Sequence, residues 1–352
     1  MNYKLKKIVS SILAVVIAVF PAANAFACTR VLHNDSHGNF VTGRTMDWKE
    51  EIQTNLWAFP AGMKRIGGEG KDPIHWTSKY GSVIASAYDI ATSDGVNEKG
   101  LSANILWLAE SQYPVVKEGE KTLTISMWAQ YVLDNFATVD EAVKALEKNP
   151  FVLVTAEVPG QSRDATVHLS MSDKSGDSAI IEYIDGKQVI HHSKSYEVMT
   201  NSPEFSQQIS LNDYWKGIGG NVFLPGTNRA ADRFVRASYY NSVIDNTTDL
   251  NKTVASVFGI MKNVSVPYGI KSLTDEVNIS STRWTTVFDH TRGLYFFQSS
   301  VMPNVFWVDI NKIDLSDKTG KVLKLDLGKE QSNVFAGEVS GKFVESKMMN
   351  FL

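Results

Sequence analysis

Two spacings of hydrophobic residues run along the chain, and each predicts a different kind of element. Alternating apolar and polar residues predict strands, and residues 34–38 have the polar composition of a hairpin turn between the first two. The expected strands are Thr29–His33, Asn39–Thr45, Ser82–Tyr88, Gly100–Ala109, Phe151–Val158, Thr166–Met171, Ser178–Ile184, Gln188–Ser193, Tyr196–Thr200, Thr282–Asp289, Leu294–Gln298 and Val305–Ile310.

Apolar residues spaced three and four positions apart predict helices at Leu123–Phe136, Arg229–Ile244 and Leu250–Val264. A further helix is expected to run through Leu146, because residues 138–141, with the sequence TVDE, form a capping box. Strand blocks separated by helix pairs indicate an α+β fold with helices packed on antiparallel sheets. Residues 28–352 contain no repeat and no linker-like tract, so we expect a single domain there.

The first 27 residues have the pattern of a secretory signal peptide. Three lysines lie within residues 1–7, an apolar run covers Ile8–Phe20, and residues 25–27 form an A-x-A sequence directly before Cys28. Cleavage at this point would release residues 28–352. We therefore expect a periplasmic or secreted protein whose first residue is Cys28.

Such a cleavage would give Cys28 two reactive groups, a thiol and a free α-amino group. The thiolate is the reactive form of a cysteine, and an α-amino group titrates at about 7.7–8.0, close to neutral pH. An N-terminal amine can serve as the base that activates a neighbouring nucleophile. Cys28 is therefore a candidate catalytic nucleophile that becomes competent only after cleavage.

Two other interpretations of Cys28 stay open on these residues alone. The cysteine could carry the lipid of a bacterial lipoprotein, although bulky Phe26 is unusual before such a site, and a strand follows where a polar tether is common. It could also be an incidental structural thiol. As the only cysteine of the chain, it cannot form an internal disulfide.

Composition narrows the class of protein. Hydrophobic residues make up 43% of the chain, with eight tryptophans, as in a folded globular protein. The chain has 35 basic and 38 acidic residues, and loss of three signal-peptide lysines would change its net charge from −3 to −6. Binding to nucleic acid or to an anionic membrane is therefore not expected. No second apolar stretch is long enough to cross a bilayer, so we expect no membrane anchor.

Arg44, Asp47 and Trp48 lie on the second strand of the first hairpin, which returns the chain toward Cys28. A guanidinium near a thiol favours the thiolate, and a carboxylate near an α-amine can orient it. The alternative is an ordinary surface ion pair. Neither a metal nor a cofactor is expected, because adjacent His191 and His192 would face opposite sides of a strand.

Six short motifs follow one another along the chain: Cys28-Thr29-Arg30, Gly43-Arg44-x-x-Asp47-Trp48, Asn97-Glu98-Lys99-Gly100-Leu101, Met199-Thr200-Asn201-Ser202-Pro203, Leu224-Pro225-Gly226 and Asp232-Arg233-Phe234-Val235-Arg236. Together they resemble the choloylglycine hydrolase family of N-terminal cysteine hydrolases, which includes penicillin V acylases and bile salt hydrolases. The motifs cover two-thirds of the chain. The resemblance implies a four-layer αββα sandwich.

The resemblance also implies roles for five residues. Cys28 would be the nucleophile, with its own α-amine as the proton acceptor. Arg44 and Asp47 would set the charge and orientation of the thiolate and the amine. Asn201 would donate to the oxyanion, although Asn-Ser-Pro after a strand is by itself an ordinary turn. Arg233 would be a second arginine near the catalytic centre.

Trp107 occupies a position where bile salt hydrolases of the family usually carry asparagine. Its backbone N–H can still serve as the second oxyanion donor, and its ring with that of Trp48 could flank an acyl group. The tryptophan pair resembles the Gram-negative penicillin V acylase branch, which implies penicillin V or N-acyl-homoserine lactones as substrates. Both indoles could instead be core residues. A bile salt hydrolase and a lipid-anchored binding protein remain alternatives, and family relatives are often homotetramers.

Overall fold

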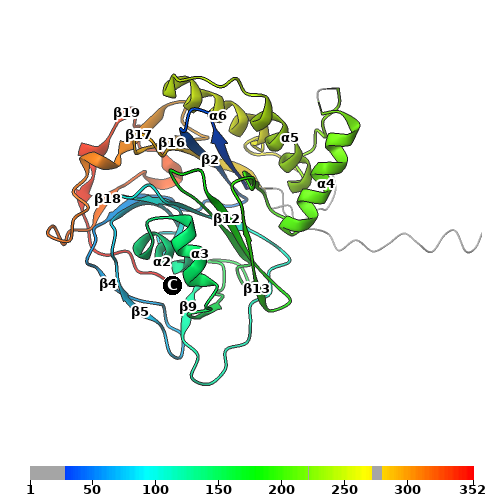
Figure 1. Ribbon diagram of the computed structural model, residues 1–352. Coiled ribbons are helices and arrows are strands. Elements are labelled where there is room, and N and C mark those ends of the chain that lie inside the picture. Colours follow the sequence, from blue (N-terminus) through cyan, green and yellow to red (C-terminus); the bar gives the residue numbers. More distant parts are fainter. Residues whose placement is uncertain (1–27, 221, 272–279) are drawn as a thin grey trace, which may run out of the picture.

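Two large sheets lie face to face, and helices cover their outer sides (Figure 1). The computed structural model describes residues 28–220, 222–271 and 280–352. The first sheet consists of β1 (Thr29–Asn34), β2 (Phe40–Trp48), β14 (Val198–Met199), β15 (Ser281–Asp289), β16 (Leu294–Ser299), β17 (Val305–Asp309) and β19 (Gly337–Glu338). Its strand order is β14-β1-β2-β15-β16-β17-β19, and only the β17–β19 pair among these described strands is parallel.

The second sheet is antiparallel and has the strand order β13-β12-β11-β8-β7-β6-β3-β18-β20. Its strands are β3 (Leu56–Phe59), β6 (Ser82–Ala87), β7 (Ala91–Asn97), β8 (Ser102–Trp107), β11 (Val167–Ser172), β12 (Ser178–Ile184), β13 (Lys187–His192), β18 (Leu323–Leu325) and β20 (Val344–Glu345). Two short ribbons pair β4 (Lys64–Ile66) with β5 (His75–Thr77), and β9 (Thr122–Thr124) with β10 (Val152–Val154).

The helices form the two outer layers. They are α2 (Trp128–Asn135), α3 (Val139–Leu146), α4 (Phe205–Ile218), α5 (Ala230–Val243) and α6 (Leu250–Val264), with 3-10 turns η1 (Ile125–Met127), η2 (Ile310–Lys312), η3 (Lys329–Gln331) and η4 (Ser340–Lys342). The helices α5 and α6 pack on the first sheet, whereas α2 and α3 pack on the second. This is the αββα layering expected from the sequence.

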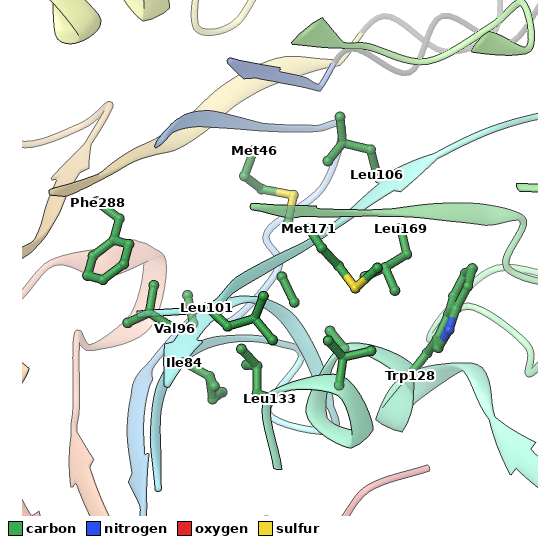
Figure 2. Close-up of a cluster of buried hydrophobic side chains, with 14 of the residues drawn as sticks. Met46, Ile84, Val96, Leu101, Leu106, Trp128, Leu133, Leu169, Met171 and Phe288 are labelled. Carbon is green, nitrogen blue, oxygen red and sulfur yellow. The ribbon is translucent and has the colours of Figure 1, made fainter. Parts of the chain in front are cut away.

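A continuous apolar core joins the layers (Figure 2). The residues labelled there come from β2, β15, α2, the second sheet and the turn before β8: Met46, Phe288, Trp128, Leu133, Ile84, Val96, Leu106, Leu169, Met171 and Leu101. Trp128 and Leu133 are fully buried beneath the second sheet. Each large apolar side chain buried in this way contributes about 1.5–3 kcal/mol.

The first hairpin is confirmed. In β1 and β2, Thr29 pairs with Thr45 and Asn34 pairs with Phe40. This register brings the beginning of β1 beside the end of β2. The capping box at α3 is also confirmed, because the hydroxyl of Thr138 accepts a hydrogen bond from the backbone N–H of Glu141 at 3.2 Å. The structure likewise confirms α5 and α6, within a residue or two of their expected ends.

The helix expected at Leu123–Phe136 was predicted to begin too early. Residues 122–124 form β9, and α2 begins only at Trp128. The backbone of this stretch is held by neighbouring segments: the N–H of Thr124 donates to the carbonyl of Gly67 at 2.7 Å, and the carbonyl of Thr122 accepts from Ile74 at 2.9 Å. Backbone groups that a helical turn in this stretch would use are thus bonded to distant segments, so the helix begins later.

Other differences concern buried polar positions and short pairings. The strand β7 was not expected because Thr92, Ser93 and Asp94 are polar, although all three are buried between layers. The helix α4 was not expected because it buries few apolar side chains. The strands expected at Phe151–Val158 and Tyr196–Thr200 shorten to β10 and β14, and the short strands β18, β19 and β20 were not expected.

Candidate active site

Cys28 lies at the start of β1 and is 3% exposed. Its sulfur accepts a hydrogen bond from the backbone N–H of Asp47 at 3.5 Å and lies 3.8 Å from the carbonyl oxygen of the same residue. Both contacts follow from the hairpin, since Asp47 lies at the end of β2. The structure therefore brings together the cysteine and the motif that sequence analysis associated with it.

Burial, together with the nearby Asp47 carboxylate, raises the pKa of the Cys28 thiol to about 11. The guanidinium groups of Arg44 and Arg233 act in the opposite direction. In the full chain the nitrogen of Cys28 belongs to a peptide bond. A free α-ammonium group at that atom would add a positive charge next to the sulfur and so favour the thiolate.

Arg233 connects α5 to the cysteine. Its Nη1 donates to the carbonyl of Cys28 and to the hydroxyl of Thr29, both at 2.6 Å, and its Nη2 donates to Oδ1 of Asn201 at 2.8 Å. The guanidinium is fully buried, and burial lowers its pKa, whereas the charges of Asp47 and Cys28 raise it. Arg233 therefore positions the backbone of the cysteine and the side chain of Asn201 at the same time.

The side-chain amide of Asn201 has one orientation. Its Oδ1 accepts from the nitrogen of Cys28 at 2.6 Å and from Arg233, while its Nδ2 donates to the carbonyl of Trp107 at 2.7 Å. An amide nitrogen carries two hydrogens, so the contact with Trp107 engages one of them. The Nδ2 atom therefore has donor capacity beside the cysteine.

Two buried side chains, His168 on β11 and Glu182 on β12, bind the backbone of the turn that carries Asn201. His168 contacts the carbonyl of Thr200 through Nε2 at 2.8 Å and contacts Glu182 through Nδ1 at 3.0 Å. Glu182 also accepts from the backbone N–H of Phe205 at 3.1 Å. We call His168 and Glu182 the turn clamp, because they bind the backbone on both sides of Asn201.

Asp47 and Arg44 are both buried, but neither side chain hydrogen-bonds Cys28 within the described residues. The Asp47 carboxylate accepts from Thr282 at 2.5 Å and from Thr45 at 3.3 Å, and burial raises its pKa to about 6 against the effect of Arg233. Arg44 donates to the carbonyl of Ile105 at 2.9 Å. Its guanidinium lies 4.5 Å from the centre of the Trp284 ring. Orientation of the amine by Asp47 stays a prediction.

A pocket of about 130 Å³ opens beside Cys28, between the first and second sheets. Its lining is mainly apolar and includes Cys28, Arg44, Met46, Trp48, Ile52, Tyr88, Ile90, Ile105, Leu106, Trp107, Ile125, Ser126, Val158, Val167 and Leu352. The rings of Trp48 and Trp107 lie 5.7 Å apart in its wall, and each residue is only 7% exposed. The two indoles thus belong to the core and to the pocket wall.

Sequence analysis missed three residues around this pocket. The hydroxyl of Tyr88 accepts from Nε1 of Trp48 at 2.7 Å. The guanidinium of Arg163 lies 4.7 Å from the ring centre of Trp107 and 5.9 Å from that of Trp48. Leu352 lines the same pocket. These residues are far apart in the chain and belong to no motif, so no local signal pointed to them.

Comparison with known proteins agrees with this geometry. Residues 28–324 match the linear amide C–N hydrolases of the choloylglycine hydrolase family. The chain belongs to this family. It is 54% identical to a penicillin V acylase from Pectobacterium atrosepticum over 99% of this chain and 98% of that protein. It is 24% identical to a bile salt hydrolase/transferase from Clostridium perfringens over 84% of this chain and 96% of that protein.

A solved structure of penicillin V acylase from Agrobacterium tumefaciens is 56% identical, with a TM-score of 0.86 over 92% of this chain and 99% of that one. A conjugated bile acid hydrolase from Clostridium perfringens is 23% identical with a TM-score of 0.71, which shows a shared fold. The protein is thus a hydrolase of linear amide C–N bonds, as the sequence motifs indicated.

Proposed function

We propose that this hydrolase cleaves the side-chain amide of penicillin V or of similar N-acyl amides, with Cys28 as the nucleophile. The observation that carries the proposal is the position of Cys28 in the wall of a small apolar pocket, beside two tryptophans. The relatives named penicillin V acylase, at 54% and 56% identity, support the same substrate class.

We propose that the pocket beside Cys28, which we call the acyl pocket, receives the acyl part of the amide, and its size favours a small acyl group over a bile salt. An apolar cavity of about 150 Å³ in another protein is large enough to bind benzene. The acyl pocket, at about 130 Å³, is comparable and would hold one aromatic ring or a short acyl chain. A steroid nucleus has four fused rings and needs more space. Bile salt hydrolysis therefore remains the second candidate function, supported by the more distant relatives.

The proposed reaction begins with attack of the Cys28 thiolate on the amide carbonyl. The oxyanion that forms would accept a hydrogen bond from Nδ2 of Asn201, whose amide is oriented by Arg233 and by the nitrogen of Cys28. The backbone N–H of Trp107 would be the second donor. Arg44 and Arg233 place positive charge near the sulfur and stabilise the thiolate.

Collapse of this intermediate breaks the C–N bond and leaves a thioester on Cys28. The α-amine of Cys28, which took the thiol proton, would pass that proton to the departing amine. Water then attacks the thioester, with the α-amine accepting its proton, and the free carboxylic acid leaves. Every proton in this sequence moves through groups of the cysteine itself, so no further acid or base is required.

The proposal is tested by hydrolysis rates for penicillin V, an N-acyl-homoserine lactone and taurocholate, using a chain that begins at Cys28. We expect the highest kcat/KM with one of the first two substrates, and no turnover by a Cys28→Ala variant. Faster hydrolysis of taurocholate would favour the bile salt alternative. Turnover retained by Cys28→Ala would exclude the cysteine mechanism.

We further propose that residues 1–27 are removed during export and that the protein works in the periplasm or outside the cell. These residues lie outside the described part of the structure. The proposal is supported by the A-x-A sequence before Cys28 and by the family match, which begins at Cys28. Within the described ranges, no helix is long and apolar enough to span a membrane. A lipid on Cys28 is the remaining alternative.

Assembly into a homotetramer is also a proposal. The helix α4 projects from the rest of the molecule in Figure 1 and exposes apolar side chains, among them Tyr214 at 65% and Ile218 at 45% exposure. Exposed apolar surface of this kind often marks a contact between protein chains. Light scattering of the purified protein would give its mass in solution, and a monomer would exclude the tetramer.

A further inference from the structure

Leu352 lies in the wall of the acyl pocket, although it is 324 positions from Cys28 in the chain. Its segment runs past the second sheet toward α2 and β9, where the C label stands in Figure 1. The backbone N–H of Leu352 donates to the carbonyl of Ile90 at 3.2 Å, and its carbonyl accepts from the hydroxyl of Ser126 at 2.7 Å. Ile90 and Ser126 line the same pocket.

The residues before Leu352 anchor it firmly. Met349 is 3% exposed, and the ring of Phe351 lies 6.2 Å from that of Phe59 in β3. The guanidinium of Arg65 lies 5.5 Å from the Phe351 ring and forms a buried ion pair with Asp134 of α2. Leu352 is therefore held in place by the core and by its own backbone bonds.

Leu352 is less buried than the wall residues that belong to the two sheets. Ile105 and Leu106 belong to β8, and Trp48 and Trp107 are part of the core as well as the wall. Leu352 is 45% exposed, and it belongs to no strand or helix. Its side chain can change in size without repacking a sheet.

Because the pocket is small, a change of a few carbon atoms in its wall alters the acyl group that fits. We propose that Leu352 is a specificity-determining residue that limits the length of the acyl group in the pocket. The proposal rests on the proposed function, since it assumes that the pocket receives the acyl part of the amide. One methylene group in an apolar pocket changes discrimination by about 10–200-fold.

The test uses Leu352→Ala, Leu352→Trp and a matched control, Val344→Ala. Val344 lies in β20 of the same C-terminal region, is 63% exposed and does not line the pocket. Hydrolysis is measured on N-acyl-homoserine lactones of increasing acyl length. We expect Leu352→Ala to move the highest kcat/KM to chains longer by about two methylene groups, with roughly tenfold gains there. Leu352→Trp should move it to shorter chains, and the control should match the parent protein.

Binding of the free carboxylic acids of the same lengths, followed by tryptophan fluorescence, gives a readout independent of turnover. If the parent protein hydrolyses neither penicillin V nor any member of the series, but the variants shift the acid length that binds best, the proposed function is wrong and the role of Leu352 stands. If both variants keep the length preference of the parent protein in binding and in hydrolysis, the role of Leu352 is overturned. A Ser126→Ala variant, which loosens Leu352 without changing its side chain, should broaden the preference, and an unchanged preference would count against the role.

Discussion

Asn201 is where the contacts of the active site converge. Its side chain joins the nitrogen of Cys28, the guanidinium of Arg233 and the carbonyl of Trp107, with donor–acceptor distances of 2.6–2.8 Å. Two donors fix its oxygen, and its nitrogen is turned toward the carbonyl of Trp107. In the proposed mechanism the same nitrogen donates to the oxyanion. The electrostatic benefit of such a donor comes from its being oriented before the reaction begins.

Replacing Asn201 by alanine should therefore lower kcat by about 10²–10³ and leave KM nearly unchanged. The lost donor acts on the charge that develops during attack, not on the bound amide. Steady-state kinetics with penicillin V measures both constants, and unchanged circular dichroism would show that the fold is intact. A rise in KM at constant kcat would mean that Asn201 binds substrate instead.

How far the sequence predicted these residues depends on their separation in the chain. Cys28, Arg44 and Asp47 share one hairpin, so local pairing was enough to place them together. Asn201 follows a two-residue strand and has the sequence of an ordinary turn, and only the family resemblance singled it out. Arg163 and Leu352 reach the pocket from segments whose positions depend on long-range packing, which no local pattern encodes.

The turn around Asn201 depends on the turn clamp in the second sheet. His168 and Glu182 are fully or almost fully buried, and they bind the carbonyl of Thr200 and the backbone N–H of Phe205. Burial by itself raises the pKa of Glu182, but hydrogen bonds from His168 and His191 outweigh it and hold the pKa at about 2. The carboxylate form is thus stabilised in the folded protein.

This lowered pKa gives a testable dependence of stability on pH. A carboxyl group whose pKa is about 2 when folded and 4.5 in its ordinary state adds stability above pH 4.5, which is lost as the pH falls toward 2. Glu182→Gln should be less stable than the parent protein at neutral pH, and the difference should shrink across this range. Urea unfolding at several pH values measures it, and a constant difference would contradict the assignment.

The elements themselves were predicted where apolar periodicity decides their structure. The helices α5 and α6 and the strands β15, β16 and β17 each bury an apolar face, and their patterns were sufficient. The strand β7 buries Asp94 instead, which accepts hydrogen bonds from Asn104 on the neighbouring strand β8 and from Tyr295 on the facing sheet. The groups that bond to Asp94 lie on other elements, and the local sequence of β7 does not show them. From its sequence alone, this polar segment could not be told from a loop.

The four layers together create the pocket and its nucleophile. The first sheet supplies Cys28, Arg44 and Trp48, and the second supplies Ile105 and Trp107, so the pocket depends on how the sheets are packed. The outer helices hold this packing. At Gly43 of β2, side chains of α6 lie directly against the strand backbone.

A side chain at Gly43 should therefore destabilise the whole molecule. An added Cβ would lie 2.6 Å from Cγ1 of Val257 and 3.0 Å from Cγ of Met261, both on α6. Gly43→Ala should lower the free energy of unfolding by about 1–3 kcal/mol through overpacking. Gly259→Ala, on the same helix with nothing within 4 Å, is the matched control and should stabilise by about 0.5–1 kcal/mol. Equal effects of the two changes in urea unfolding would contradict close packing of α6 on β2.

The most direct test of catalysis by an N-terminal cysteine is the intact mass of the protein expressed from residues 1–352, alone and after rapid acid quenching during turnover of penicillin V. We expect the mass of Cys28–Leu352, with a fraction raised by one acyl group, and no such fraction for Cys28→Ala, which has no nucleophile, under the same conditions. A mass raised by a diacylglyceryl group, or turnover by a protein that keeps residues before Cys28, would contradict the mechanism.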